Sequence, residues 1–210
     1  MKLDIRIDTR QIERQLTDLQ RKQIPFATAV TLTRLAEAVK AEMPAELERV
    51  LDRPKPFTAR FSVYTQRATK AKLYSVVGFK DRQAGYLAAL LEGGARKLKT
   101  AEQRFLGRPI VPGPDMRLDR YGNVPKATLV RILKAAQSKS YMPDGRFVFV
   151  TDAGVFARKG RKVQTLLLFA DSRPTYRKTI DLEKVATKVV QRRAQAEFNR
   201  AMAEAIRTAR

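Results

Sequence analysis

Residues 24–39 read IPFATAVTLTRLAEAV, and they carry the strongest structural signal in the chain. Their apolar residues recur every three or four positions, which is the spacing of one face of an α-helix. Pro25 is suited to the first turn of such a helix, because proline lacks an N–H that the first turn leaves unpaired. The stretch therefore predicts a long helix that begins near Pro25, and Met43-Pro44 predicts a kink or an end to that helix.

Both ends of the chain add regular elements to this helix. Residues 3–7 alternate between apolar and charged, which is typical of a short half-buried strand. Asp8 or Thr9 offers an N-cap to a helix that extends to about Lys22. After Pro174, we expect a last helix from Asp181 to the C-terminus, with an apolar stripe that suits packing on a sheet.

The middle of the chain predicts two pairs of strands. Residues 57–65 and 72–80 are rich in β-branched and aromatic residues, and the short segment between them is basic, which predicts a hairpin with a basic tip. Residues 146–150 and 163–170 predict a second strand pair, joined across the basic turn at 158–162.

The segment between these strand pairs contains many prolines and glycines. Short helices are expected at 86–92, 101–106 and 126–137, with irregular chain between them. We therefore predict a single α+β domain over residues 1–210, in which a small antiparallel sheet of hairpins is packed by long N- and C-terminal helices. Residues 95–145 form an irregular Pro/Gly-rich insertion, or arm, within that domain.

Composition narrows the classes of function. The chain has no His and no Cys, which excludes imidazole- or thiolate-dependent catalysis, Cys/His zinc sites and disulfides. Asp115 and Asp119 lie in the Pro/Gly-rich segment, where aspartate commonly serves turn geometry. We expect no enzyme activity, no metal and no cofactor. The longest apolar run, at 166–170, is too short for a membrane span, and the first ten residues lack the apolar core of a secretory signal.

The positive charge is concentrated in the middle of the chain. Residues 1–52 have nine Lys/Arg against nine Asp/Glu, whereas residues 53–178 have 27 against 8 and residues 179–210 have 7 against 4. Salt screens charges over about 8 Å at physiological ionic strength, so this concentration predicts an anionic partner or an acidic neighbouring subunit.

Three basic runs are the candidate partner-facing sites. The candidate residues are Arg67, Lys70 and Lys72 at the first hairpin tip, Arg96, Lys97 and Lys99 after Gly93-Gly94, and Arg158, Lys159, Arg161 and Lys162 at the second hairpin tip. A solvated surface explains any single run, but three runs with few acids between them favour an electropositive patch. The aromatic residues Phe61, Tyr64, Tyr74 and Phe79 have strand spacing, which favours core packing over base stacking for most of them. No motif for reading base sequence is present, so any DNA contact is expected to be with the backbone.

Several stretches carry a family resemblance. They are residues 23–29 (QIPFATA), 52–58 (DRPKPFT), 68–73 (ATKAKL), 77–81 (VGFKD), 86–87 with 92–94 (YL and EGG), 118–119 with 121–123 (LD and YGN) and 173–178 (RPTYRK). In this order along the chain, they resemble bacteriophage minor tail and tail-completion (neck) proteins of the head–tail junction. The resemblance implies a virion subunit of α+β fold that is made in the host cytoplasm and assembles into a ring, commonly six- or twelve-fold, between connector and tail.

This resemblance sets the partners that we expect. They are further copies of the chain, the neighbouring connector and tail proteins, and duplex DNA contacted without regard to sequence; no membrane is expected. Much of the charge is expected to face an acidic neighbouring ring and only some of it the lumen, because a strongly basic lumen would hold sliding DNA too tightly. Two alternatives stay open: a basic nucleic-acid-binding phage protein that acts off the virion, and an internal or ejection protein of the virion.

Overall fold

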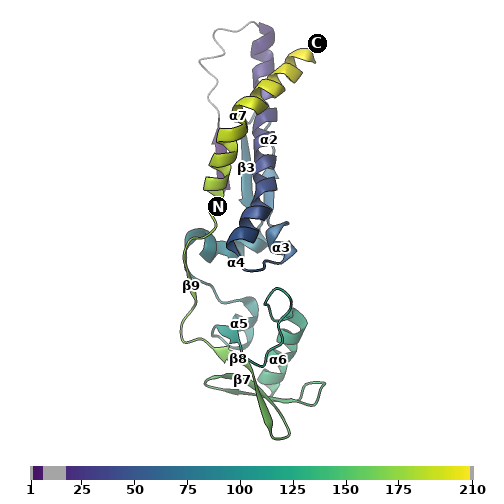
Figure 1. Ribbon diagram of the computed structural model, residues 1–210, viewed down its shortest axis with the longest axis vertical. Helices are drawn as coiled ribbons and strands as arrows, with labels where there is room; N and C mark the ends of the chain where they lie inside the picture. The colour runs from purple at the N-terminus through teal and green to yellow at the C-terminus, as the bar shows by residue number, and fades with distance from the viewer. Residues whose placement is uncertain (1, 7–17, 209–210) are drawn as a thin grey trace. The chain divides into compact units, whose positions relative to one another are not determined.

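The computed structural model describes residues 2–6 and 18–208, and the side chains of residues 23–208. The chain divides into two compact units (Figure 1). Unit 1 comprises Met1–Leu87 and Thr179–Arg210, and unit 2 comprises Ala88–Lys178. The sequence predicted a single domain with an insertion at 95–145. Residues 88–178 form one of these units, in which Ile110–Pro112, inside the predicted arm, pairs with residues 167–169 beyond it.

Unit 1 contains a three-stranded antiparallel sheet in the order β1-β3-β2. Its strands are β1 (Lys2–Arg6), β2 (Val63–Gln66) and β3 (Tyr74–Phe79). The predicted first strand and first hairpin are both confirmed, with β2 and β3 joined by the basic segment. Two short helices flank the hairpin: α3 (Pro56–Ala59) precedes it, and α4 (Asp81–Glu92) follows it.

Two long helices cover this sheet. Helix α2 (Asp18–Val50) packs against β2 and β3, and helix α7 (Leu182–Arg207) lies along α2 (Figure 1). Ala27 of α2 is fully buried against Ala201 and Ala205 of α7, and these small side chains allow the two helices to approach closely. The predicted start of the last helix is confirmed, because the side chain of Asp181 caps α7 by accepting from the backbone N–H of Lys184 at 3.1 Å.

Both prolines of α2 lie inside the helix. The prediction that the helix begins at Pro25 is therefore wrong, as is the alternative that it ends at Met43-Pro44. Each proline costs one backbone hydrogen bond, or about 3 kcal/mol. Burial of side chains beyond them, such as Met43 and Leu47 at 0% exposed, offsets that cost at about 1.5–3 kcal/mol each. Most of the shorter helix predicted before Lys22 lies outside the described residues.

The strand predicted at 57–65 is shorter than expected. Only Val63–Gln66 pair with β3, and the residues before them form α3, with Pro56 in its first turn. Phe79 is packed in the core as predicted, at 4% exposed, but Phe61 is 59% exposed. Phe61 lies between α3 and β2, where strand spacing no longer sets the direction of its side chain.

Unit 2 is built on a four-stranded antiparallel sheet in the order β5-β8-β7-β6. Its strands are β5 (Ile110–Pro112), β6 (Phe147–Thr151), β7 (Gly154–Lys159) and β8 (Lys162–Phe169). Helix α6 (Lys126–Ser138) packs against β6, and α5 (Thr100–Phe105) packs against α6. Ile132, Leu133, Val148, Val155 and Leu166 form the centre of their shared core, each at most 1% exposed. A separate two-stranded pair joins β4 (Gly94–Ala95) to β9 (Thr175–Tyr176).

Strand β7 was not predicted. The sequence paired 146–150 with 163–170, but β7 lies between them and pairs with both β6 and β8. Gly154 permits this close approach, because a Cβ there would lie 2.1 Å from the carbonyl oxygen of Leu167. The basic residues at the end of β7 were interpreted as part of a turn, which concealed the strand. Overall, the predicted α+β class, with small antiparallel sheets and long terminal helices packed together, is confirmed.

Candidate functional site

The first basic run lies at the tip of the β2–β3 hairpin. Arg67, Lys70 and Lys72 are all exposed there. Backbone hydrogen bonds exchanged between Thr69 and Lys72, at 2.9 and 3.0 Å, close the tip. The ammonium of Lys70 lies 5.2 Å from the centre of the Phe26 ring, a cation–π distance that holds this lysine along α2.

One residue of the second basic run, Arg96, is held in an ion pair within unit 2. Arg96 forms a two-pronged pair with Glu102, at 2.7 and 2.8 Å, and the two side chains are only 14% and 1% exposed. Burial acts to raise the pKa of Glu102, but hydrogen bonds from Arg96 and from the backbone N–H groups of Lys99 and Ile110 outweigh burial and lower it. Arg96 is thus committed to its carboxylate, whereas Lys97 and Lys99 are exposed.

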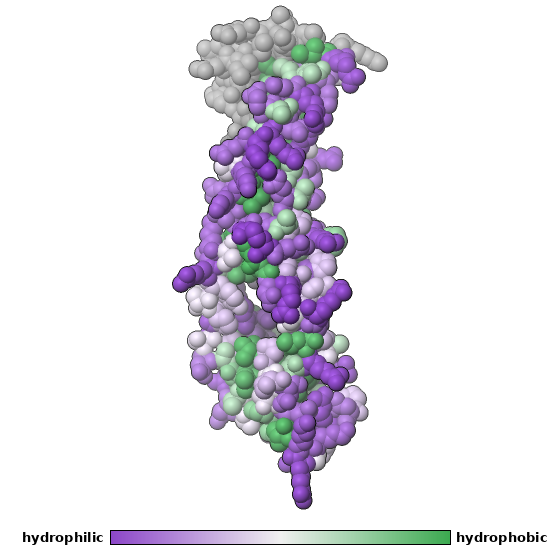
Figure 2. Space-filling view, in the orientation of Figure 1, coloured by the Kyte–Doolittle hydropathy of each residue, from purple (hydrophilic) through white to green (hydrophobic). Residues whose placement is uncertain are grey.

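The third basic run forms the tip of the β7–β8 hairpin. Lys159 pairs with Lys162 across a two-residue loop, and Gly160 has the positive φ of 60° that such tight loops require. Arg158, Lys159, Arg161 and Lys162 are all exposed. Figure 2 shows hydrophilic residues over this projecting end of the hairpin.

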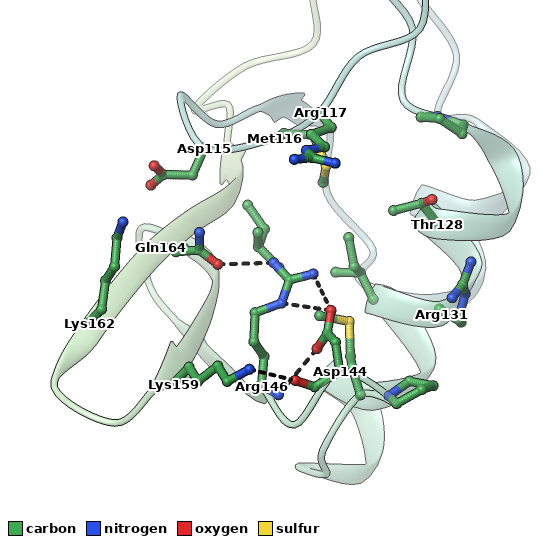
Figure 3. Close-up of a pocket in the computed structure, with 15 residues that line it drawn as sticks. Asp115, Met116, Arg117, Thr128, Arg131, Asp144, Arg146, Lys159, Lys162 and Gln164 are labelled. Carbon is green, nitrogen blue, oxygen red and sulfur yellow. Dashed lines mark hydrogen bonds and ion pairs between the residues drawn. The ribbon is translucent and has the colours of Figure 1, made fainter.

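A groove opens beside this hairpin, entirely within unit 2 (Figure 3). Its volume is about 770 Å³, within the range of ligand-binding clefts. Buried side chains of the core, Met116, Ile132, Met142 and Leu166, form the apolar part of its lining. Five cationic side chains also line it, and we call it the basic groove: Arg117, Arg131, Arg146, Lys159 and Lys162.

Arg146 lies at the centre of the basic groove and is held in place. Its guanidinium donates to Asp144 Oδ2 at 2.9 and 2.6 Å and to Gln164 Oε1 at 3.0 Å. The hydrogen bond from Arg146 lowers the pKa of Asp144. Lys159 donates to the backbone carbonyl of Asp144 at 3.2 Å, which ties the hairpin to the same turn.

Three other cations of the basic groove are unpaired. Among the residues with described side chains, no carboxylate lies within ion-pair distance of Arg117, Arg131 or Lys162. Figure 3 shows Lys162 on one side of Arg146 and Arg131 on the other. The remaining acid of the lining, Asp115, accepts the backbone N–H of Thr165 at 2.7 Å. The groove therefore presents unneutralised positive charge from separate elements, which favours anions electrostatically.

The sequence predicted only part of this site. Lys159 and Lys162 were candidates, but Arg117, Arg131 and Arg146 were not. Each of the three arginines stands in a different segment and has no basic residue directly beside it in the sequence, so only the tertiary fold gathers them. The first candidate run belongs to unit 1, and the second and third belong to unit 2.

The two aspartates of the Pro/Gly-rich segment have structural contacts. Asp119 Oδ1 accepts from the backbone N–H groups of Tyr121 and Asn123, both at 3.0 Å, in agreement with the predicted turn role. In the part of the chain that the structure describes, no cluster of carboxylates could hold a metal ion. No helix in the same residues has the length and apolarity to cross a membrane.

The fold and the groove define a class: a two-unit α+β protein with a groove lined by cationic side chains beside a basic β-hairpin. Comparisons with family models, with curated proteins and with solved structures found no match to the chain.

Proposed function

We propose that the chain is a structural virion protein of the head–tail junction of a tailed bacteriophage, where copies of it form a ring around the DNA channel. The observation that carries the proposal is the separation of charge. The long helices of unit 1 pair their charges with one another, whereas unit 2 has 19 Lys/Arg against 7 Asp/Glu and presents exposed cations on a hairpin. A subunit placed between protein neighbours and DNA needs both kinds of surface.

Exposed aromatic side chains in unit 1 support the ring. Phe57 and Tyr86 are 46% and 45% exposed, and Phe61 is 59% exposed. Phe57 and Tyr86 belong to one locality, because Thr58 is hydrogen bonded to Tyr86 Oη at 2.7 Å and Gln83 donates to the Phe57 carbonyl. Large apolar side chains gathered on a surface are typical of protein contacts. We assign the surface at Phe57 and Tyr86, together with the exposed side chain of Phe61, to contacts between subunits.

Mass spectrometry of purified particles tests the location. The chain is expected in virions at a constant copy number that matches a ring. Its absence from particles would contradict the proposal and favour the alternative, a basic nucleic-acid-binding phage protein that acts off the virion. The exposed hairpin tip of Arg158, Lys159, Arg161 and Lys162 is the observation behind that alternative.

Electron microscopy and native mass spectrometry of the purified chain test the assembly. We expect closed rings of six or twelve copies, and Phe57→Ser with Phe61→Ser should shift them toward monomers. Val163→Ser is the matched control, since Val163 is also exposed, at 51%, but belongs to the hairpin of unit 2. A chain found in virions without rings would favour the second alternative, an internal or ejection protein.

A further inference from the structure

The basic groove has the chemistry of a phosphate site. Arg117, Arg131 and Lys162 supply donors whose charge no acid of the described residues neutralises. Arginine suits phosphate particularly well, because its planar guanidinium gives two parallel N–H donors to two oxygens. Thr128 and Gln164 add uncharged polar groups to the lining. The groove therefore offers charged and neutral donors to an anion with several acceptor oxygens.

The position of the groove beside the β7–β8 hairpin points to a polymeric anion. Lys159 and Lys162 belong both to the hairpin and to the groove lining. Arg158 and Arg161 are exposed on the same hairpin, outside that lining. The positive surface is therefore continuous from the groove to the tip, and it extends further than one small anion could use.

Duplex DNA fits this combination. The major groove of B-DNA, about 12 Å wide, admits a two-stranded β-ribbon. A ribbon in that position places its base next to the phosphates that border the DNA groove. An acidic peptide would use the charge but would leave the projecting ribbon without a complementary recess.

We propose that the basic groove binds backbone phosphates of duplex DNA while the β7–β8 hairpin tip lies in an adjacent groove of the duplex. Arg117, Arg131 and Lys162 contact the phosphates. The guanidinium of Arg146 is held by Asp144 and Gln164, and it ties the turn before β6 to β8. The binding is independent of base sequence because these contacts are with the backbone. This inference rests on the DNA-facing part of the proposed function.

Salt titration of binding tests the proposal. The probe is a 20-base-pair duplex of mixed sequence, and its anisotropy is measured with the purified full chain between 50 and 200 mM salt. Each phosphate neutralised steepens the log–log salt dependence by about 0.9. The triple variant Arg117→Gln, Arg131→Gln, Lys162→Gln should therefore bind with a slope shallower by about 2.7, and a second duplex of different sequence should give the same result.

A matched variant removes the same charge elsewhere in unit 2. Arg104→Gln, Lys134→Gln and Arg173→Gln replace exposed cations outside the groove lining. Lys134 stands on the same helix as Arg131, which makes that pair of substitutions a direct comparison. We expect the control slope to stay within about 1 of the wild-type slope. Both triple variants should keep the wild-type melting temperature, because all six side chains are exposed.

Three outcomes would overturn the proposal. Equal changes in the salt-dependence slope of the two triple variants would show that the protein's net charge, and not the groove, determines DNA binding. Groove-dependent binding of a poly-glutamate peptide that is tighter than binding of the duplex would assign the groove to an acidic protein partner. A wild-type chain that does not bind duplex DNA at 50 mM salt would contradict both the inference and the DNA contact of the proposed function. Absence from virions, by contrast, would contradict only the head–tail location.

Discussion

The two units differ in how they neutralise their cations. In unit 1, arginines pair across or along the long helices: Arg34 lies 2.8 Å from Glu204, and Arg192 pairs with Glu42. In unit 2, the acids are too few for the cations, and two of them secure buried or half-buried arginines, Glu102 with Arg96 and Asp144 with Arg146. Unit 1 therefore uses ion pairs between helices, whereas unit 2 uses its few acids to fix loops and leaves the other cations exposed.

Because of this difference, we expect separate residues of unit 2 to determine its stability and its binding of anions. Substitution of an unpaired cation of unit 2 should change affinity for anions with little effect on folding. Substitution at the close contacts or the paired acids of unit 2 should change folding instead. The three predictions below test this separation, from the largest expected effect to the smallest.

Gly154→Ala should have the largest effect, because its Cβ would lie 2.1 Å from the Leu167 carbonyl oxygen and 3.0 Å from the Leu168 Cα. Both contacts are with backbone, so β7 and β8 must move apart. We expect a loss of about 3 kcal/mol in the free energy of unfolding of unit 2. Hydrogen exchange resolved by residue measures it, and unit 1 should keep wild-type protection.

The matched control for this substitution is Gly85→Ala in α4. A Cβ at Gly85 meets nothing within 4 Å, and the residue is exposed. Alanine in a helix interior should stabilise the chain by up to about 1 kcal/mol. Equal losses from the two substitutions would contradict the account of β7–β8 packing.

Glu102→Gln should have the next largest effect. The substitution leaves the Arg96 guanidinium, 14% exposed, without its counter-charge and removes one acceptor oxygen of the two-pronged pair. We expect unit 2 to lose about 2 kcal/mol, measured by chemical denaturation. Glu92→Gln is the control, since Glu92 is exposed, and it should change stability by less than about 0.5 kcal/mol.

The pH dependence of the same variant gives a second readout. The folded-state pKa of Glu102 lies below its ordinary value of 4.5. The stability that the charged Glu102 contributes to the folded state is therefore present above pH 4.5, and it is lost as the pH falls through the folded-state pKa. Wild-type stability should therefore decrease as the pH falls below about 4.5, and Glu102→Gln should decrease less. Parallel curves for the two proteins would contradict this role of Glu102.

The ion pair between Arg34 and Glu204 should have the smallest effect. The two side chains are 35% and 42% exposed, so water screens their attraction. A double-mutant cycle with Arg34→Gln and Glu204→Gln should give a coupling of about 0.5–1 kcal/mol that shrinks in 1 M salt. A coupling above about 2 kcal/mol would show that pairing between the helices stabilises unit 1 more strongly than exposure allows.

The sequence predicted those helices whose ends and faces are set by residues close together in the chain. The start of α7 at Asp181 was predicted, and the helix predicted over 126–137 is observed over 126–138, because capping and periodicity are properties of neighbouring residues. The path of α2 through Pro25 was not predicted, because burial against distant strands outweighs the local cost of proline. Strand β7 was not predicted for a similar reason. The sequence prediction paired 146–150 directly with 163–170, and this left no place for β7 between them.

The candidate site divides in the same way. Its hairpin half, Lys159 and Lys162, stood in a basic run that the sequence displays directly. Its other half, Arg117, Arg131 and Arg146, comes from three segments that only the fold of unit 2 brings to one groove. Charge counting located the basic region, but it could not separate Arg96, which is committed to Glu102, from the cations that remain available.

The short β4–β9 pair suits an evolutionary origin of unit 2 as an insertion into unit 1. Gly94 pairs with Tyr176 and Ala95 pairs with Thr175, and the backbone N–H of Arg96 donates to the Pro174 carbonyl at 2.8 Å. The chain therefore enters and leaves unit 2 at one place, as it does when a gene segment is inserted into a pre-existing host domain. Such a junction allows unit 2 to be lengthened, replaced or removed in related genes while unit 1 keeps both of its halves. The surface proposed to meet DNA and the surface proposed to meet other subunits would then be free to evolve at different rates within one polypeptide.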